Sequence, residues 1–140
     1  AYEYIAQRPG KSISGIKFTI PSSLAEGTNL SSDSYISVEH LPVGESCIAS
    51  AFLSDPNAVS HSVTEGSISY SVASSIDAVA GNRYQEAVYA RKDSNPCIAV
   101  RYFVHYGAIE NFPDGEVKKF DKTVLLEQFD QIRKTLRVAQ

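Results

Sequence analysis

A strand–turn–strand segment in the second half of the chain constrains the fold more than any other feature. Two runs with alternating apolar residues, Arg83–Arg91 and Cys97–Tyr106, flank the turn-forming residues Lys92–Pro96. The second run has an apolar or aromatic side chain at every second position, the period of a β-strand, at Ile98, Val100, Tyr102, Val104 and Tyr106. Its other face is half apolar, with Ala99 and Phe103. We therefore predict a hairpin whose second strand lies in the middle of a sheet and is covered on both faces.

Alternation elsewhere in the chain predicts further strands. They cover Ser14–Ile20, Tyr35–Leu41, Ser67–Ile76 and, at the end, Thr135–Val138. In the third of these strands, we expect one face to point into the core, at Ile68, Tyr70, Val72, Ser74 and Ile76. The opposite face is rich in serine, including Ser71, and we expect water to cover it. The intervening segment around His61 is polar and is interpreted as a loop.

Two helices are expected. The small and apolar residues of Ser46–Leu53 are typical of a short helix. A longer helix begins after Asp121, which stands where a capping side chain is needed. One apolar stripe at helical spacing follows, at Leu125, Phe129, Ile132 and Leu136. The basic residues near its end, including Arg133, are interpreted as a solvated face that complements the helix dipole.

Length and charge limit the class of protein. A chain of 140 residues corresponds to a single globular domain, 1–140. The mixture of elements predicts an α+β fold with an antiparallel sheet flanked by helices. The net charge is −3 with no long run of either sign, so we expect no binding to nucleic acid. No apolar run approaches the ~20 residues of a membrane span.

The two cysteines bear on the compartment. Cys47 and Cys97 are the only cysteines, and neither lies in a CxxC motif or a Cys/His cluster. We predict a disulfide between them, and the alternative is two buried thiols. A disulfide favours a periplasmic or extracellular location. The sequence begins at Ala1 and has no methionine, so we expect that a leader or a tag, with or without a lipid anchor, preceded Ala1.

No residue pattern predicts a metal site, a cofactor or a catalytic centre. The three histidines are far apart and lack HxH or HxxxH spacing, and there is no GxSxG motif. The most unusual polar residues are Arg101 and His105, on the same face of the central strand as Phe103. Residues four apart in a strand are about 13 Å from each other, so we expect them not to touch. We interpret them as a candidate surface site whose members each cap the core, in solvent or paired with a carboxylate such as Glu86.

The chain resembles the PsbP-like superfamily, a fold shared with a nuclear Ran-binding protein, and within it the small bacterial periplasmic or lipoprotein members of unknown function. The resemblance rests on Gly15–Pro21, Gly81–Tyr89, Pro96–His105, Phe120–Asp121, Phe129–Ile132 and Thr135–Val138. It implies an antiparallel sheet between helices, that is, an α/β/α sandwich. None of these motifs is catalytic, and no set of residues implies the family's specific partners.

These observations lead to a first hypothesis of a secreted or periplasmic, non-catalytic binding or accessory domain. Its partner would be another protein or a component of the cell envelope. One alternative is a small hydrolase that uses His105 with a serine or an acidic residue. Another is a proteinaceous enzyme inhibitor with its inhibitory loop in Ser22–Ser34, Val43–Gly44 or Ala108–Glu116.

Overall fold

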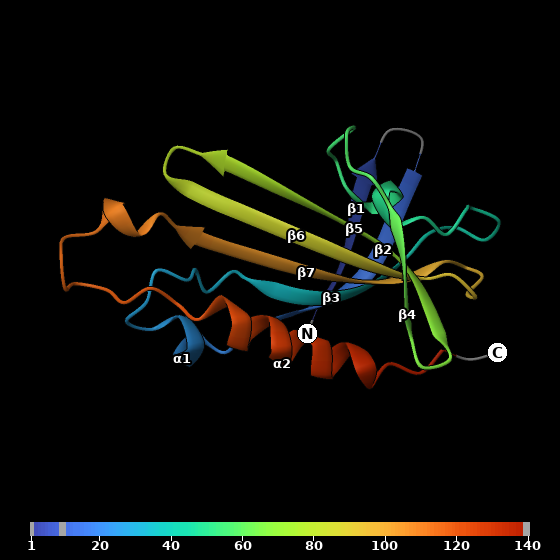
Figure 1. The fold of residues 1–140 in the computed structure, drawn as a ribbon. Helices are drawn as coiled ribbons and strands as arrows, with labels where there is room; N and C mark the ends of the chain where they lie inside the picture. Colours follow the sequence, from blue (N-terminus) through green and yellow to red (C-terminus); the bar gives the residue numbers. More distant parts are fainter. Residues whose placement is uncertain (1, 9–10, 139–140) are drawn as a thin grey trace.

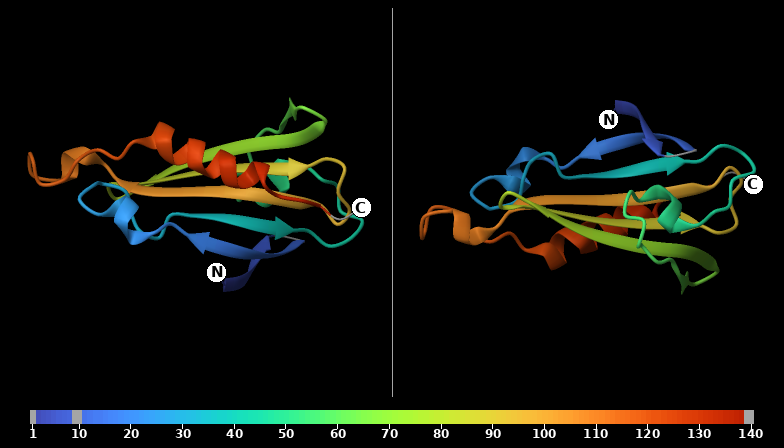
Figure 2. Two further views of the ribbon diagram at one scale, coloured as in Figure 1. Left: turned by 90° about the horizontal axis from the view of Figure 1, so that it is seen from below. Right: turned by 90° about the horizontal axis from the view of Figure 1, so that it is seen from above.

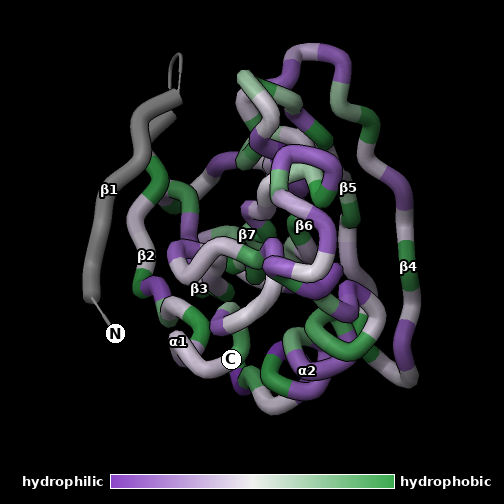
Figure 3. Tube along the Cα trace, turned by 90° about the vertical axis from the view of Figure 1, so that its left-hand side faces the viewer, coloured by the Kyte–Doolittle hydropathy of each residue, from purple (hydrophilic) through white to green (hydrophobic). Residues whose placement is uncertain are grey.

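One antiparallel sheet of seven strands organises the computed structural model of the chain, which describes residues 2–8 and 11–138. The strand order is β1-β2-β3-β7-β6-β5-β4 (Figure 1). The strands are β1 (Tyr2–Arg8), β2 (Lys11–Thr19), β3 (Tyr35–His40), β4 (His61–Glu65), β5 (Ile68–Val79), β6 (Asn82–Arg91) and β7 (Ile98–Gly107). Strand β4 lies at one edge of the sheet (Figure 3).

The predicted hairpin is confirmed and lies at the centre of the sheet. Strand β7 pairs with β6 on one side and with β3 on the other. Its two faces contribute to different clusters of buried side chains. Val100, Tyr102 and Val104 belong to one cluster, and Ala99 belongs to the other. The alternation read from the sequence therefore reflects a strand covered on both sides.

The helices are distributed unequally over the two faces. The long helix α2 (Lys122–Lys134) packs on one face, and the 3-10 helix η1 (Ala49–Phe52) lies on the other (Figure 2). Two short helices, α1 (Ser22–Ala25) and η2 (Ile109–Asn111), lie in connections. The α+β class is confirmed. A sandwich with a full helical layer on each face is not, because η1 has only four residues.

The helix expected over Ser46–Leu53 is thus reduced to one turn. Cys47 is tied to Cys97, and Ile48 has an extended backbone with φ −123° and ψ 126°. A helix can begin only at Ala49, whose amide donates to Ser71 Oγ at 2.9 Å. Ser71 is therefore buried beneath η1, and the expectation of a wetted serine face is wrong at this position.

Helix α2 begins as predicted. The side chain of Asp121 accepts a hydrogen bond from the Val124 amide at 3.1 Å. Leu125 and Phe129 are buried against the sheet, whereas Ile132 is 51% exposed. The inward position near the C-terminal end belongs to Arg133, which is 2% exposed, so the prediction of a solvated arginine is wrong.

Other expectations also need correction. His61 begins strand β4 and does not lie in a loop. Ile76, expected in the core, is 70% exposed, because α2 packs against β7 and does not cover this end of β5. Residues Thr135–Val138 form no strand. Among the described residues, no helix is long and apolar enough to cross a membrane.

Candidate functional site

Arg101 lies in the interior and is held by two carboxylates. Its Nε donates to Glu39 Oε2 at 2.7 Å, and its Nη1 donates to Glu86 Oε1 at 2.8 Å. A third bond runs from Nη2 to the carbonyl oxygen of Phe52 at 2.6 Å. Arg101 is only 3% exposed, so it lies inside the fold and is not a member of an exposed surface site. The pairing with Glu86 is the one suggested by the sequence.

The cluster of Arg101 with its two carboxylates fits because Gly15 has no side chain. Gly15 lies on β2, opposite Glu39 on β3. A Cβ atom there would lie 2.6 Å from the Val38 carbonyl oxygen and 2.9 Å from Glu39 Cγ. Burial alone would lower the pKa of Arg101, but the hydrogen bonds and charge of Glu39 and the charge of Glu86 raise it above its usual value. The guanidinium therefore remains charged inside the protein.

His105 has separate partners for both of its ring nitrogens. Its Nδ1 lies 2.8 Å from Asp33 Oδ1, and its Nε2 lies 2.9 Å from Asn82 Oδ1. Partial burial would raise the pKa of Asp33, but hydrogen bonds from Ser31 and His105 hold it below its usual value. Asp33 and His105 resemble the acid and base of a triad. However, Asn82 occupies the position in which a nucleophilic serine would have to face Nε2.

A row of stacked side chains crosses this face of the sheet. The rings of Tyr35 and Phe103 stack with centroids 4.8 Å apart, and those of Tyr84 and His105 stack at 4.3 Å. Tyr84 and Phe103 connect the two pairs at 6.0 Å, and Lys17 Nζ lies 4.6 Å from the Tyr35 centroid. The row joins β7 to its neighbours β3 and β6.

A second buried arginine anchors helix α2 to the sheet. Arg133 Nη1 donates to Glu65 Oε1 at 2.6 Å, and its Nε donates to the hydroxyl of Tyr102 at 2.7 Å. The guanidinium carbon also lies 4.9 Å and 4.2 Å from the ring centroids of Tyr70 and Tyr89. Sequence reasoning missed this cluster. The only signal was that Arg133 lies four residues after Phe129 on the inward stripe.

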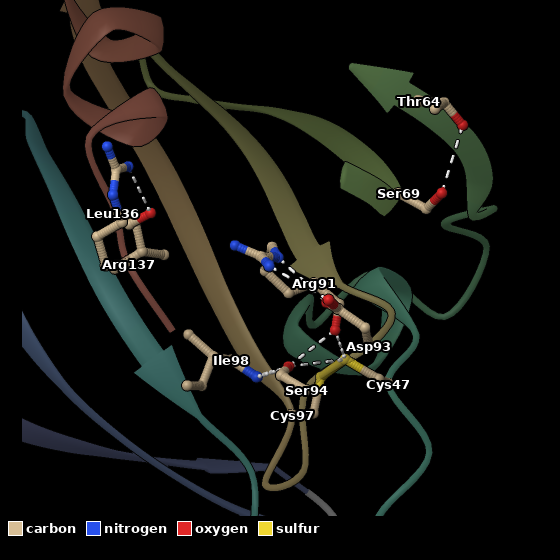
Figure 4. A network of polar contacts seen from close by, with 10 residues as sticks. All are labelled: Cys47, Thr64, Ser69, Arg91, Asp93, Ser94, Cys97, Ile98, Leu136 and Arg137. Atoms are coloured by element: carbon tan, nitrogen blue, oxygen red, sulfur yellow. Dashed lines mark hydrogen bonds and ion pairs between the residues drawn. A yellow bond between two sulfur atoms is a disulfide. The ribbon is translucent and has the colours of Figure 1, made fainter. Parts of the chain in front are cut away.

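The cysteine pair is confirmed as a disulfide. The Cα atoms of Cys47 and Cys97 are 5.0 Å apart. Figure 4 shows the bond beside the turn between β6 and β7, where Ser94 Oγ accepts from the Ile98 amide at 2.9 Å. The bond therefore connects the loop before η1 to the start of the central strand.

An apolar groove on the α2 face is a candidate binding site. It has a volume of about 500 Å³ and lies between β2, α1 and α2. Phe18 and Ile132 line it with large exposed fractions, 46% and 51%. The remaining apolar lining comes from Ile20, Pro21, Leu24, Ile36 and Phe129. The polar lining is uncharged and consists of Thr19, Gln128, Gln131 and Thr135.

No group of His, Cys, Asp or Glu side chains within the described ranges could hold a metal ion. Comparison of the chain with protein-family models, with curated proteins and with solved structures finds no match.

Proposed function

We propose that this chain is a non-catalytic domain of the periplasm or the extracellular space that binds a partner protein through the groove between β2, α1 and α2. The observation that carries the proposal is the groove itself. An apolar cavity of this size with a few polar groups on its lining is the usual form of a binding site. Large apolar side chains such as Phe18 and Ile132 lose their exposed surface when a partner covers them.

The lining favours a protein over an anionic lipid or an acidic small molecule. The polar side chains around the groove are glutamines and threonines, which can exchange hydrogen bonds with a partner. An apolar centre with a polar, hydrogen-bonding rim is characteristic of protein interfaces. An anionic headgroup or a carboxylate would instead call for an arginine or lysine on the lining.

The compartment is inferred from the disulfide between Cys47 and Cys97, since such bonds persist in oxidising environments. A lipid anchor upstream of Ala1 is compatible with this location and belongs to the proposal. Membership of the PsbP-like superfamily with its α/β/α sandwich is also part of the proposal, and the sequence resemblance supports it. The pairing of His105 Nε2 with Asn82 supports a binding role over hydrolysis.

The test is capture of partners from the cell envelope of the source cells. We would crosslink the unmodified chain and the double variant Phe18→Glu/Ile132→Glu, which places two charges in the groove. Val43→Glu/Val59→Glu is the matched control, because both valines are exposed and lie outside the groove. We expect an envelope protein that the unmodified chain and the control capture and the groove variant does not. Equal capture by all three chains, or no captured protein, would contradict the proposal.

A further inference from the structure

Along more than half of its length, β5 pairs with a strand on one side only, as far as the described residues show. Strand β4 pairs only with Ile68–Val72, whereas β5 continues to Val79. Within the described residues, Ala73–Val79 pairs with β6 alone. Ala73 is fully buried, so we call Ser74–Val79 the free edge. It contains neither lysine nor proline, the residues that commonly protect an exposed strand from pairing.

The backbone of the free edge is oriented for pairing. The turn Ala80–Gly81 has positive φ at both residues, 49° and 84°, as in a two-residue hairpin, so Val79 and Asn82 form its closing pair. Hydrogen bonding toward a given neighbour alternates along an antiparallel strand. Ser74, Ile76 and Ala78 therefore direct their amides and carbonyls away from β6. Of these three residues, Ala78 already uses its amide, which donates to Asp77 Oδ1 at 2.9 Å.

A cavity lies beside the free edge on each face of the sheet. On the α2 face, a cavity of about 210 Å³ is lined mainly by apolar groups of Ile76, Ala87, Tyr102, Val104 and Leu126. On the opposite face, a cavity of about 470 Å³ is lined by the acidic residues Asp55, Asp77 and Glu86 and by the rings of Tyr84 and Phe103. Glu86 is already paired with Arg101. Asp55 and Asp77 are both exposed, and their carboxylates give this cavity a negative charge.

We propose that the free edge binds an extended segment of a partner protein in which apolar and basic residues alternate. The segment adds a strand beside β5 through main-chain hydrogen bonds. Its successive side chains point to opposite faces, so apolar residues enter the cavity beside Leu126 and lysines or arginines enter the acidic cavity. This site goes beyond the proposed function, because it uses neither Phe18 nor Ile132.

A second copy of this chain is a poorer occupant of the free edge. On the face of the acidic cavity, a second copy would present Ser75, Asp77 and Val79. None of these side chains is basic, and Asp77 would add a like charge. Charge complementarity therefore favours a basic segment.

The experiment measures the affinity of fluorescein-labelled peptides by anisotropy with the full chain. The first peptide alternates leucine and lysine. The second replaces every lysine with glutamate, and the third carries N-methyl groups on alternate amides, which removes the donors needed for strand pairing. We expect the first to bind and the other two to bind at least about tenfold more weakly. The glutamate peptide loses charge complementarity with the acidic cavity, and the N-methylated peptide loses several main-chain hydrogen bonds.

Matched variants locate the bound peptide. Ile76→Lys and Asp77→Asn are expected to weaken binding of the leucine–lysine peptide several-fold. Val43→Lys and Asp114→Asn are the controls, because Val43 has a similar exposure of 73% and neither residue lines the two cavities. Urea unfolding of each variant establishes that it is folded. Phe18→Glu/Ile132→Glu is expected to bind the peptide normally, which separates this site from the groove.

Four results would overturn the proposal. The first is that the leucine–lysine peptide does not bind, and the second is that the glutamate or N-methylated peptide binds with equal affinity. The third is that the control variants lose as much affinity as Ile76→Lys and Asp77→Asn. The fourth is that the groove variant no longer binds the peptide. Sedimentation analysis provides a fifth, since a dimer that Ile76→Lys dissociates would assign the free edge to a second copy of the chain.

Discussion

Arg101 and Glu39, on neighbouring strands β7 and β3, form a two-point ion pair inside the protein. Arg101 Nε lies 2.7 Å from Glu39 Oε2, and Arg101 Nη2 lies 2.9 Å from Glu39 Oε1. Both side chains are almost fully buried, so water cannot replace either partner. A buried charge that loses its counter-charge is strongly destabilising, whereas replacing both members by apolar groups costs much less.

We therefore predict that Arg101→Met lowers the free energy of unfolding by about 3–5 kcal/mol. The double variant Arg101→Met/Glu39→Met should lose less than the sum of the two single changes, because it leaves only Glu86 of the cluster. Urea unfolding followed by circular dichroism measures both. Lys92→Met, at an exposed lysine, is the control. Additive losses in the double variant would mean that the pair is not coupled.

The disulfide is expected to contribute a large part of the stability. Cys47 and Cys97 are separated by 50 positions. In the chain-entropy description, a loop of this length stabilises the folded state by about 4 kcal/mol. Reduction should lower the free energy of unfolding by up to this amount and add two hydrogen atoms to the intact mass. In the variant Cys47→Ala/Cys97→Ala, reductant should change neither the free energy of unfolding nor the intact mass.

Acid should weaken the contact between α2 and β4. The hydrogen bond from Arg133 holds the pKa of Glu65 below its usual value of 4.5, and partial burial opposes this only in part. Because the pKa is lower in the folded state, the stabilisation is present above pH 4.5 and is lost as the pH falls through the folded-state value. Glu65→Gln should therefore flatten the dependence of the melting temperature on pH below about 4.5.

The control for this measurement is Glu116→Gln, at an exposed glutamate in the loop before α2. The two variants should differ in the slope of melting temperature against pH between pH 5 and pH 3, a window of about two units around the usual glutamate pKa. Identical slopes would show that the Glu65–Arg133 contact does not respond to acid.

A side chain at position 15, in place of Gly15, is expected to destabilise the folded protein. A Cβ atom would lie 2.6 Å from the Val38 carbonyl oxygen, and the neighbouring backbone cannot yield without disturbing Glu39. Overpacking of this kind costs about 1–3 kcal/mol. Gly15→Ala should lose this amount in urea unfolding, whereas Ser14→Ala on the same strand should change little. A neutral Gly15→Ala would mean that β2 and β3 can separate locally.

The sequence predicted the elements with strong local signals. Alternation identified the hairpin of β6 and β7, and Asp121 marked the start of α2 because capping depends on a residue's immediate neighbours. It missed β4, His61–Glu65, because an edge strand with exposed side chains needs no apolar alternation. It also placed Ile76 in the core, since period two shows which face a residue is on but not whether another layer covers that face.

The candidate site was harder to predict for a related reason. Arg101 and His105 were recognised as unusual, yet their roles depend on Glu39 and Asp33, which are distant in sequence and bear no pattern of their own. Arg133 looked like an ordinary basic residue at a helix end. Its burial depends on Glu65, which lies 68 positions earlier. The groove combines residues from three separated segments, so no local window contains it.

The bond between Cys47 and Cys97 encloses η1, β4, β5 and β6 in one covalent ring. A protease that cuts the exposed residues Asp55–Asn57 would therefore release no fragment. Gel electrophoresis without reductant would show a band of unchanged mass, and reductant would divide it into two pieces. A nicked molecule would thus stay joined across the cut for as long as the disulfide remains oxidised.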